Sequence, residues 1–321
     1  MVILVTGAAG FLGSHVVDLL LAQGHHVVGL DSFDDFYPRT VKEANLLKAK
    51  AMDHFELVEA DIRDRSRLDG LRADIQQVIH LAARAGVRPS IERPDLYASV
   101  NIEGTWSLLE WARTQSIKHF IVASSSSVYG NSSRVPFCES HFVGAPISPY
   151  AATKRATELA CHTHCHLYGM SIIALRFFTV YGPRQRPDLA IHKFARLLRD
   201  GQPLPVFGDG TTARDYTYID DILQGIEGAQ RLLESSPEPR FEIINLGESR
   251  TVTLSAMIEI LSEEMGVRAQ IDQLPAQPGD VRQTYADVTK AQELLGYDPR
   301  WAFRDGVRAF LTWLENTTEG L

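Results

Sequence analysis

The sequence has few cysteines, no long hydrophobic run and no basic cluster, and each absence excludes a class of protein. Its 321 residues include three cysteines, Cys138, Cys161 and Cys165, too few for a disulfide framework. We therefore expect free thiols and a reducing, cytoplasmic compartment. The best candidate for a membrane span, residues 2–17, contains three glycines and His15 and is shorter than the ~18 residues that a span needs. Apolar residues follow Met1 directly, without the positive region of a signal peptide.

Charge and composition narrow the classes further. Forty acidic residues against 32 lysines and arginines give a formal net charge of -8, which disfavours nucleic acid and anionic membranes as partners. Hydrophobic residues make up 45% and charged residues 22% of the chain, as in ordinary globular proteins. We expect a folded protein with a full core, and the length favours about two domains.

Short apolar runs alternate with helical apolar spacing through the first part of the chain. Buried parallel strands are expected at 2–6, 26–30, 55–60, 77–81, 119–123 and 171–176. Helices are expected at 16–22, 68–73, 101–113 and 151–168. This alternation predicts an α/β fold with a Rossmann-type doubly wound parallel sheet.

The pattern changes after residue 182. Helical spacing occurs at 188–200, 221–233, 254–265 and 304–315, with a short apolar strand at 242–246 and a turn-rich segment at 201–218. We predict that residues 1–182 form the nucleotide-binding domain and that residues 183–321 form a smaller mixed α/β substrate domain. Within the second part, residues 221–246 could return to the large sheet.

A glycine-rich loop lies between the first strand and the first helix. Gly7, Gly10 and Gly13 are spaced G-x-x-G-x-x-G, with Phe11 and Leu12 between the last two. Glycines allow the backbone to turn tightly and approach a pyrophosphate, which the helix N-terminus also attracts. Three glycines alone fit a plain tight turn equally well, but this position after a strand and before a helix favours a dinucleotide site.

Acidic residues end the second and third strands. Asp31 lies 18 residues after Gly13, near the offset expected of a carboxylate that binds the adenosine ribose. Such a carboxylate would repel a 2′-phosphate, which favours NAD over NADP. Asp61 and Ile62 would suit the amino group and the edge of the adenine. The simpler alternative for both acids is a solvated strand end.

Tyr150 and Lys154 form Y-x-x-x-K at the start of a predicted helix, so that both side chains share one face. An ammonium and a positive nicotinamide ring nearby would favour the phenolate, which acts as a general base. Four serines, residues 124–127, follow the fifth strand, at the edge where such sheets bind ligands. Taken alone, the Tyr150–Lys154 pair could be a surface pair and the four serines a polar loop. Their occurrence together with the glycine-rich loop is more specific for a catalytic site.

At this point the sequence resembles the extended short-chain dehydrogenase/reductase superfamily, and within it the NAD-dependent epimerase/dehydratase family. The matching segments are TGAAGFLG at 6–13, HLAA at 80–83, SSSSVYG at 124–130, YAATK at 150–154 and RFFTVYGP at 176–183. Three further segments resemble UDP-glucuronate 4-epimerases most: DSFDDFY at 31–37, AGVR at 85–88 and RQRPDLA at 184–190.

The resemblance implies a role for each matching residue. Tyr150 would take the proton of the sugar 4-hydroxyl while the C4 hydride passes to bound NAD, and return of the hydride to the other face of the 4-keto sugar would invert C4. Lys154 would hold the nicotinamide ribose and lower the pKa of Tyr150, and Ser125 would contact the 4-oxygen. The sugar pocket would include Ser126, Ser127 and Thr179. Leu81, Ala82 and Ala83 would contact NAD.

Arginines in the matching loops suggest an anionic substrate, because guanidinium groups bind phosphate and carboxylate in bidentate fashion. Arg88 and Arg214 are assigned to the diphosphate and Arg186 to the sugar end. Each could instead be a surface residue. Phe207 would stack on uracil, with a core phenylalanine as the alternative. Many UDP-galactose epimerases carry an arginine where this chain has Gln277, which leaves the second phosphate contact to Arg88.

Related dehydratases and decarboxylases place an acidic residue just before V-Y-G, where this chain has Ser127. Simple C4 epimerisation of UDP-glucuronate and UDP-galacturonate is therefore expected. The family resemblance also implies a homodimer joined through helices 101–113 and 151–168. The alternatives are a UDP-glucose or UDP-N-acetylglucosamine 4-epimerase, a net oxidoreductase that releases NADH, a dehydratase or decarboxylase, and a non-catalytic nucleotide-binding protein.

Residues 161–166 read Cys-His-Thr-His-Cys-His. Thiolates and imidazoles bind zinc, but on one long helix these side chains are better explained as part of an interface with the sheet or with a partner subunit. We expect no metal site.

Overall fold

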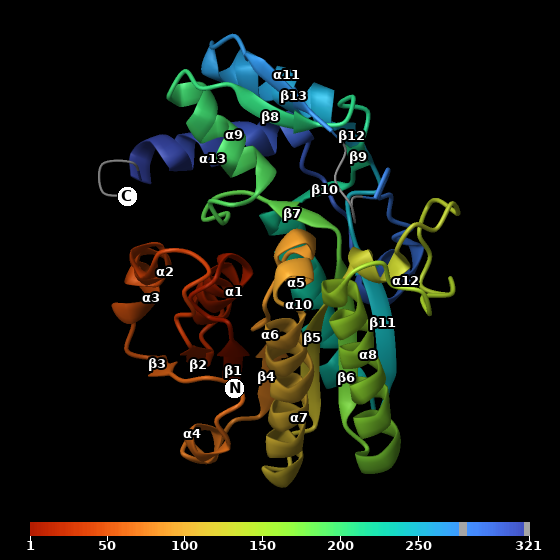
Figure 1. The fold of residues 1–321 in the computed structure, drawn as a ribbon. Helices are drawn as coiled ribbons and strands as arrows, with labels where there is room; N and C mark the ends of the chain where they lie inside the picture. The colour runs from red at the N-terminus through yellow and green to blue at the C-terminus, as the bar shows by residue number, and fades with distance from the viewer. Residues whose placement is uncertain (276–280, 318–321) are drawn as a thin grey trace.

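The computed structural model describes residues 1–275 and 281–317. Its centre is a seven-stranded sheet in which every neighbouring pair is parallel (Figure 1). In spatial order the strands are β3 (Phe55–Glu59), β2 (His26–Asp31), β1 (Val2–Thr6), β4 (Gln77–His80), β5 (His119–Ser125), β6 (Ser171–Phe177) and β11 (Phe241–Leu246). The order changes direction at β1, with β4 on its other side, as in a doubly wound sheet. The predicted fold class is confirmed.

Side chains of successive residues in each strand enter two separate cores. Ile3 and Val5 pack under α1 (Phe11–Ala22) and α10 (Ile219–Ser235) on one face. Leu4 packs on the other face, under α7 (Gly104–Thr114) and α8 (Pro149–Tyr168). Because both faces are covered, the central strands read as continuous apolar runs.

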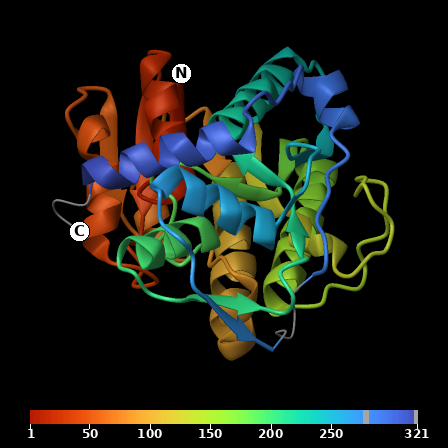
Figure 2. The same cartoon turned by 90° about the horizontal axis from the view of Figure 1, so that it is seen from above.

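A smaller lobe lies over the carboxyl ends of the strands (Figures 1 and 2). Its core joins α9 (Ala190–Arg199), α11 (Leu254–Met265) and α13 (Phe303–Thr317). Three two-stranded ladders complete it: β10 (Tyr216–Tyr218) with β7 (Thr179–Tyr181), β12 (Val252–Thr253) with β9 (Ala213–Arg214), and β13 (Ile271–Leu274) with β8 (Leu204–Phe207). The lobe therefore faces the edge of the sheet at which the glycine loop and the serines end.

Short helices account for most differences from the sequence expectations. The helix expected at 68–73 is α4 (Arg65–Asp69), because the Asp64 carboxylate accepts hydrogen bonds from the backbone N–H groups of Ser66 and Arg67 and so fixes an earlier start. The helix expected at 101–113 begins with a π-helical segment, η1 (Ala98–Glu103), before α7. Helices that were not predicted are α2 (Arg39–Asn45), α3 (Leu47–Lys50), α5 (Val87–Glu92), α6 (Pro94–Tyr97) and α12 (Thr289–Leu295).

Two further expectations concern the cysteines and membranes. Cys138, Cys161 and Cys165 are all free thiols. Within residues 1–275 and 281–317, no helix combines the length and the apolarity needed to cross a bilayer.

Candidate active site

A cavity of about 360 Å³ opens at the carboxyl ends of the parallel strands. Its wall is formed by the loop after β1, the ends of β2 to β6, the start of α8 and the segment from Thr179 to Leu189. Every residue predicted to bind the cofactor lines this one cavity: Gly7, Gly10, Phe11, Leu12, Gly13, Asp31, Asp61, Ile62, Leu81, Ala82, Ala83, Tyr150 and Lys154. The substrate-binding candidates that also line it are Ser125, Thr179 and Arg186.

The loop after β1 is packed too closely for side chains at its glycines. A Cβ atom on Gly13 would lie 2.0 Å from the carbonyl oxygen of Gly7, and one on Gly7 would lie 2.8 Å from the backbone nitrogen of Ala82. Gly7 also has a φ of 71°, a conformation that favours glycine. Gly10 precedes α1 without a side-chain cap, so backbone N–H groups at the helix start are available to a diphosphate.

Asp31 ends β2 in a buried position beside this loop. Its carboxylate accepts hydrogen bonds from the N–H groups of Ala9 at 3.0 Å and Phe33 at 2.8 Å. Burial raises the pKa of Asp31, and those hydrogen bonds and the Lys42 ammonium partly offset the effect. A fixed carboxylate here fits the hydroxyls of an adenosine ribose.

The Asp61 carboxylate is already hydrogen-bonded within the protein, which the sequence did not indicate. Arg63 binds both of its carboxylate oxygens, with distances of 2.9 Å from Nε and 2.6 Å from Nη2. These hydrogen bonds lower the pKa of Asp61. An adenine amino group would therefore share this carboxylate with Arg63.

Tyr150, Lys154 and Ser125 meet where α8 begins beside the end of β5. Burial raises the pKa of Tyr150, while a hydrogen bond with Ser125 and the charge of Arg186 act to lower it. The ammonium of Lys154 donates to the carbonyl oxygen of Ala123 at 2.8 Å and lies 6.0 Å from the centre of the Tyr150 ring. The two groups that act to lower the pKa of the phenol here are Ser125 and Arg186, and the effect of Lys154 on it stays a prediction.

The pKa of Lys154 itself is shifted. Its side chain is buried, and burial lowers the pKa to about 8. The ammonium is thus retained at neutral pH with a smaller margin than an exposed lysine has.

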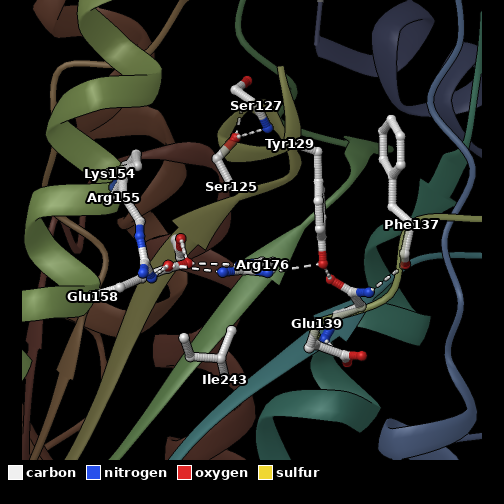
Figure 3. Close-up of polar contacts among 12 residues, drawn as sticks. Ser125, Ser127, Tyr129, Phe137, Glu139, Lys154, Arg155, Glu158, Arg176 and Ile243 are labelled. Carbon is white, nitrogen blue, oxygen red and sulfur yellow. Dashed lines mark hydrogen bonds and ion pairs between the residues drawn. The ribbon is translucent and has the colours of Figure 1, made fainter. Parts of the chain in front are cut away.

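The four serines have different surroundings, and Figure 3 shows two of them, Ser125 and Ser127. Ser125 caps the short 3₁₀ turn η2 (Ser126–Tyr129), accepting from the Ser127 N–H at 3.2 Å. Ser126 and Ser127 lie in this turn, just outside the cavity wall. Ser124 also lines the cavity, but its hydroxyl, expected to face a hydroxylated substrate, donates to Glu158 at 2.6 Å. Alternation along β5 directs this hydroxyl toward the interior.

Behind the serines lies a buried polar network (Figure 3). Arg176 on β6 binds Glu158 on α8 through Nε at 2.7 Å and Nη2 at 2.9 Å. Its Nη1 donates to the Tyr129 hydroxyl at 2.9 Å, which donates to Asn245 at 2.7 Å. The network joins the serine turn to the elements that carry Tyr150 and Thr179.

The arginines fall into two places. Arg186 lines the cavity and donates through Nε and Nη2, each at 2.9 Å, to Asp188. Arg88 lies outside the cavity wall with its guanidinium 4.5 Å from the centre of the Phe207 ring. Phe207 was expected either to stack on uracil or to lie in the core, and its ring is half-buried beneath Arg88. Arg214 lies on β9, with Nη1 donating to the carbonyl oxygen of Ala213 at 2.9 Å. Gln277 lies outside the described residues.

Several residues that line the cavity carry no signal that the sequence alone connects with the site. These are Asp34, Phe36, Tyr37 and Lys42 after β2, and Arg84 after β4. The first three lie in the segment noted only as a family signature, and Arg84 directly follows the HLAA motif. Among the described residues, Arg84 Nε is buried without a hydrogen-bond partner. It is therefore available to an anionic ligand.

The cysteine–histidine segment of α8 divides among different surroundings. His164 is buried, and its Nε2 lies 2.8 Å from Glu110 on α7. Cys161 is buried against the sheet, which raises its pKa. Across residues 1–275 and 281–317 no group of three or more histidine, cysteine or acidic side chains has a geometry that could hold a metal ion.

Known proteins resemble this chain over nearly its whole length. The family model described as GDP-mannose 4,6 dehydratase matches residues 4–310. The UDP-glucuronate 4-epimerase of Thermodesulfobacterium geofontis is 41% identical, with 98% of this chain and 97% of that protein covered. The Bacillus cereus UDP-glucuronic acid 4-epimerase, solved with UDP-glucuronic acid and NAD, is similar with a TM-score of 0.91 and 40% identity, covering 98% of this chain and 99% of that one. The Thermotoga maritima UDP-glucose 4-epimerase, solved with UDP-glucose, gives a TM-score of 0.89 and 32% identity, with 99% of both chains covered.

The close packing at Gly13 generates a prediction about the dinucleotide. The Gly13→Ala variant should bind it at least about tenfold more weakly, on the order of 1.4 kcal/mol, because the new Cβ would displace the Gly7 carbonyl. The measurement is the dinucleotide content of purified protein and its Kd by calorimetry. Gly70→Ala is the control, since its Cβ would lie 3.5 Å from the nearest atom and outside the cavity. Unchanged affinity in Gly13→Ala would exclude this loop as the binding site.

Proposed function

This chain belongs to the NAD-dependent epimerase/dehydratase family, and we propose that it is an NAD-dependent isomerase that interconverts UDP-glucuronate and UDP-galacturonate at C4. The observation that carries the proposal is the single cavity in which Tyr150 and Ser125 lie beside Arg186 and the glycine loop. The relatives of about 40% identity that are named UDP-glucuronate 4-epimerases support it.

The cavity fits NAD. The glycine loop turns this tightly only because it carries no Cβ atoms, which allows its backbone to approach a diphosphate, and Asp31 suits an unphosphorylated ribose. Lys154 would bind the nicotinamide ribose, and Leu81 to Ala83 would line the opposite wall. When bound, NAD supplies a reversible hydride acceptor for C4 of the sugar.

Proton transfer is the work of the chain's own residues. Tyr150 would remove the proton of the 4-hydroxyl, and Ser125, hydrogen-bonded to Tyr150, would hold the 4-oxygen within reach. Since burial raises the pKa of this phenol, the phenolate needs neighbouring positive charge. Arg186 supplies part of it, and Lys154 would add more as its ammonium approaches the ribose and the phenol.

A uronate substrate explains the polar groups at the sugar end. We assign its carboxylate to Ser126, Ser127 and Thr179, with Arg186 nearby, and the diphosphate to Arg88 and Arg214. Oxidation of C4 in a uronate gives a β-keto acid, which loses CO₂ readily. Hydrogen bonds that hold the carboxylate in its ionised form would suppress that loss. In a neutral-sugar epimerase, Arg186 would have no anionic group to bind.

A product assay tests the function directly. Purified protein incubated with UDP-glucuronate and no added NAD should yield the C4 epimer by NMR, while UDP-glucose stays unchanged. Tyr150→Phe should lower kcat by about 10²–10⁴, the range of a lost general base. Tyr168→Phe on the same helix, outside the cavity, should remain active. Conversion of UDP-glucose alone would reassign the protein to the neutral-sugar epimerases, and full activity of Tyr150→Phe would remove the proposed base.

The carboxylate assignment predicts a change in product. Ser127→Ala and Thr179→Val should each increase the share of UDP-pentose formed from UDP-glucuronate, because the 4-keto acid is held less firmly. Thr163→Val is the control, since its hydroxyl donates to the Leu159 carbonyl within α8, away from the cavity. If neither variant forms more pentose than the control does, these hydroxyls do not protect the carboxylate.

We also propose a homodimer through α7 and α8. These helices are neighbours, and they expose Trp106, Leu159, Leu167 and Tyr168 to between 41% and 58%. Leu159→Glu should shift the sedimentation coefficient from that of a dimer to that of a monomer, because it places a charge in the apolar face. Phe142→Glu, in an exposed loop, should leave it unchanged. A wild-type monomer at micromolar concentration would refute the dimer.

The free thiols support a proposal for the cellular compartment. All three cysteines are unpaired, and disulfide formation is rare in reducing compartments. A cytoplasmic enzyme acting on a small UDP-sugar is therefore the setting we propose. Cell fractionation that found the protein outside the cytoplasm would contradict it.

A further inference from the structure

Two arginines of the cavity wall lie against one aromatic ring. The guanidinium carbon of Arg186 is 5.1 Å from the centre of the Phe36 ring, and that of Arg84 is 5.4 Å from it. Both distances are within the range of cation–π contacts. The three residues come from the segment after β2, the segment after β4 and the loop before α9, and all three line the cavity.

Acidic residues balance the two positive charges. Arg84 pairs with Asp34 at 2.8 Å and Asp35 at 3.2 Å, and Arg186 pairs with Asp188. The side chains of Arg84 and Arg186 are only 15% and 16% exposed. Each guanidinium is therefore held by a carboxylate at its edge and by the Phe36 ring.

Asp188 occupies one edge of the Arg186 guanidinium. Its two oxygens take the Nε and one Nη2 hydrogen, and an arginine has five N–H donors in a fixed plane. Another anion must therefore approach from the side of Nη1. The Phe36 ring, 5.1 Å from the guanidinium carbon, opposes rotation of Arg186 about the Asp188 contact and so fixes the direction of Nη1.

We propose that Phe36 is a positioning residue for Arg186 and thereby determines the preference for a uronate over a neutral sugar. This inference rests on the proposed function and deepens it: Arg186, placed there near the sugar carboxylate, is taken to contact it through Nη1. Phe36 lies five residues after Asp31 on the same segment, so one stretch of chain serves both the ribose and the sugar end. Phe36 acts through Arg186 and touches no reacting atom.

The test compares Phe36→Leu with Phe36→Tyr. Leu keeps apolar bulk but has no aromatic ring, whereas Tyr retains the ring. In Phe36→Leu the KM and the Kd for UDP-glucuronate should rise about tenfold, equivalent to ~1.4 kcal/mol, with kcat within about twofold. The inhibition constants of UDP and UDP-glucose should not change. Phe36→Tyr should restore the wild-type values.

Two further variants bracket the effect. Arg186→Ala should raise the UDP-glucuronate KM at least as much as Phe36→Leu, and the double variant should be no worse than Arg186→Ala alone, because both act on one contact. Arg39→Gln is the matched control: it removes the other arginine–aromatic contact of this segment, 4.3 Å from the Phe33 ring and outside the cavity. It should behave as wild type.

The outcomes separate this inference from the proposed function. An unchanged KM in Phe36→Leu, or equal weakening of UDP, UDP-glucose and UDP-glucuronate, would overturn the positioning role. If wild type fails to epimerise UDP-glucuronate, the proposed function fails. The Kd values of UDP-glucuronate and UDP-glucose, measured by calorimetry, then test the positioning role of Phe36. If wild type binds UDP-glucuronate more tightly than UDP-glucose and Phe36→Leu loses this preference, the positioning role of Phe36 is still supported. If wild type shows no such preference, the positioning role is overturned.

Discussion

The buried ion pair between Glu158 and Arg176 is the contact on which the geometry of the site depends. Glu158 has no exposed surface and Arg176 is 1% exposed. Removing both charges from water is costly unless all their hydrogen-bonding groups are paired. Ser124 and Arg155 bind the same carboxylate, and Tyr129 binds the guanidinium. Burial alone would raise the pKa of Glu158, but the hydrogen bonds and charge of Arg176 together with the hydrogen bonds from Ser124 and Arg155 outweigh it, and the pKa is lowered.

This pair constrains three segments that supply the site. Glu158 is one turn after Lys154 on α8, Ser124 precedes Ser125 at the end of β5, and Arg176 leads through β6 to Thr179. A shift of any one segment would leave a buried charge without its partner. Besides its contribution to stability, the polar network therefore fixes the positions of the base, the serine turn and the sugar pocket relative to one another.

The smaller lobe is fixed to the sheet by a second buried carboxylate, that of Asp215. Asp215 accepts hydrogen bonds from the backbone N–H groups of Glu248, Ser249 and Ala286, and its own carbonyl accepts from the Thr179 N–H. Burial raises its pKa to about 6 in spite of these bonds. Because Arg214 is its neighbour in sequence and the Thr179 N–H donates to its carbonyl, Asp215 holds the arginine assigned to the diphosphate close to the threonine assigned to the sugar.

The sequence by itself determined the parallel sheet, the dinucleotide loop and the Tyr150–Lys154 pair, because each depends on local spacing: apolar runs for strands, glycines at a turn, and i,i+4 on a helix. Their common location also followed, since parallel strands end at one edge. Only the tertiary structure decided which serine faces inward, that Lys154 contacts Ala123, and that Asp34, Phe36 and Arg84 lie at the cavity. Those positions depend on contacts between residues far apart in the chain, such as Phe36 with Arg186, and no local pattern encodes the distance between them.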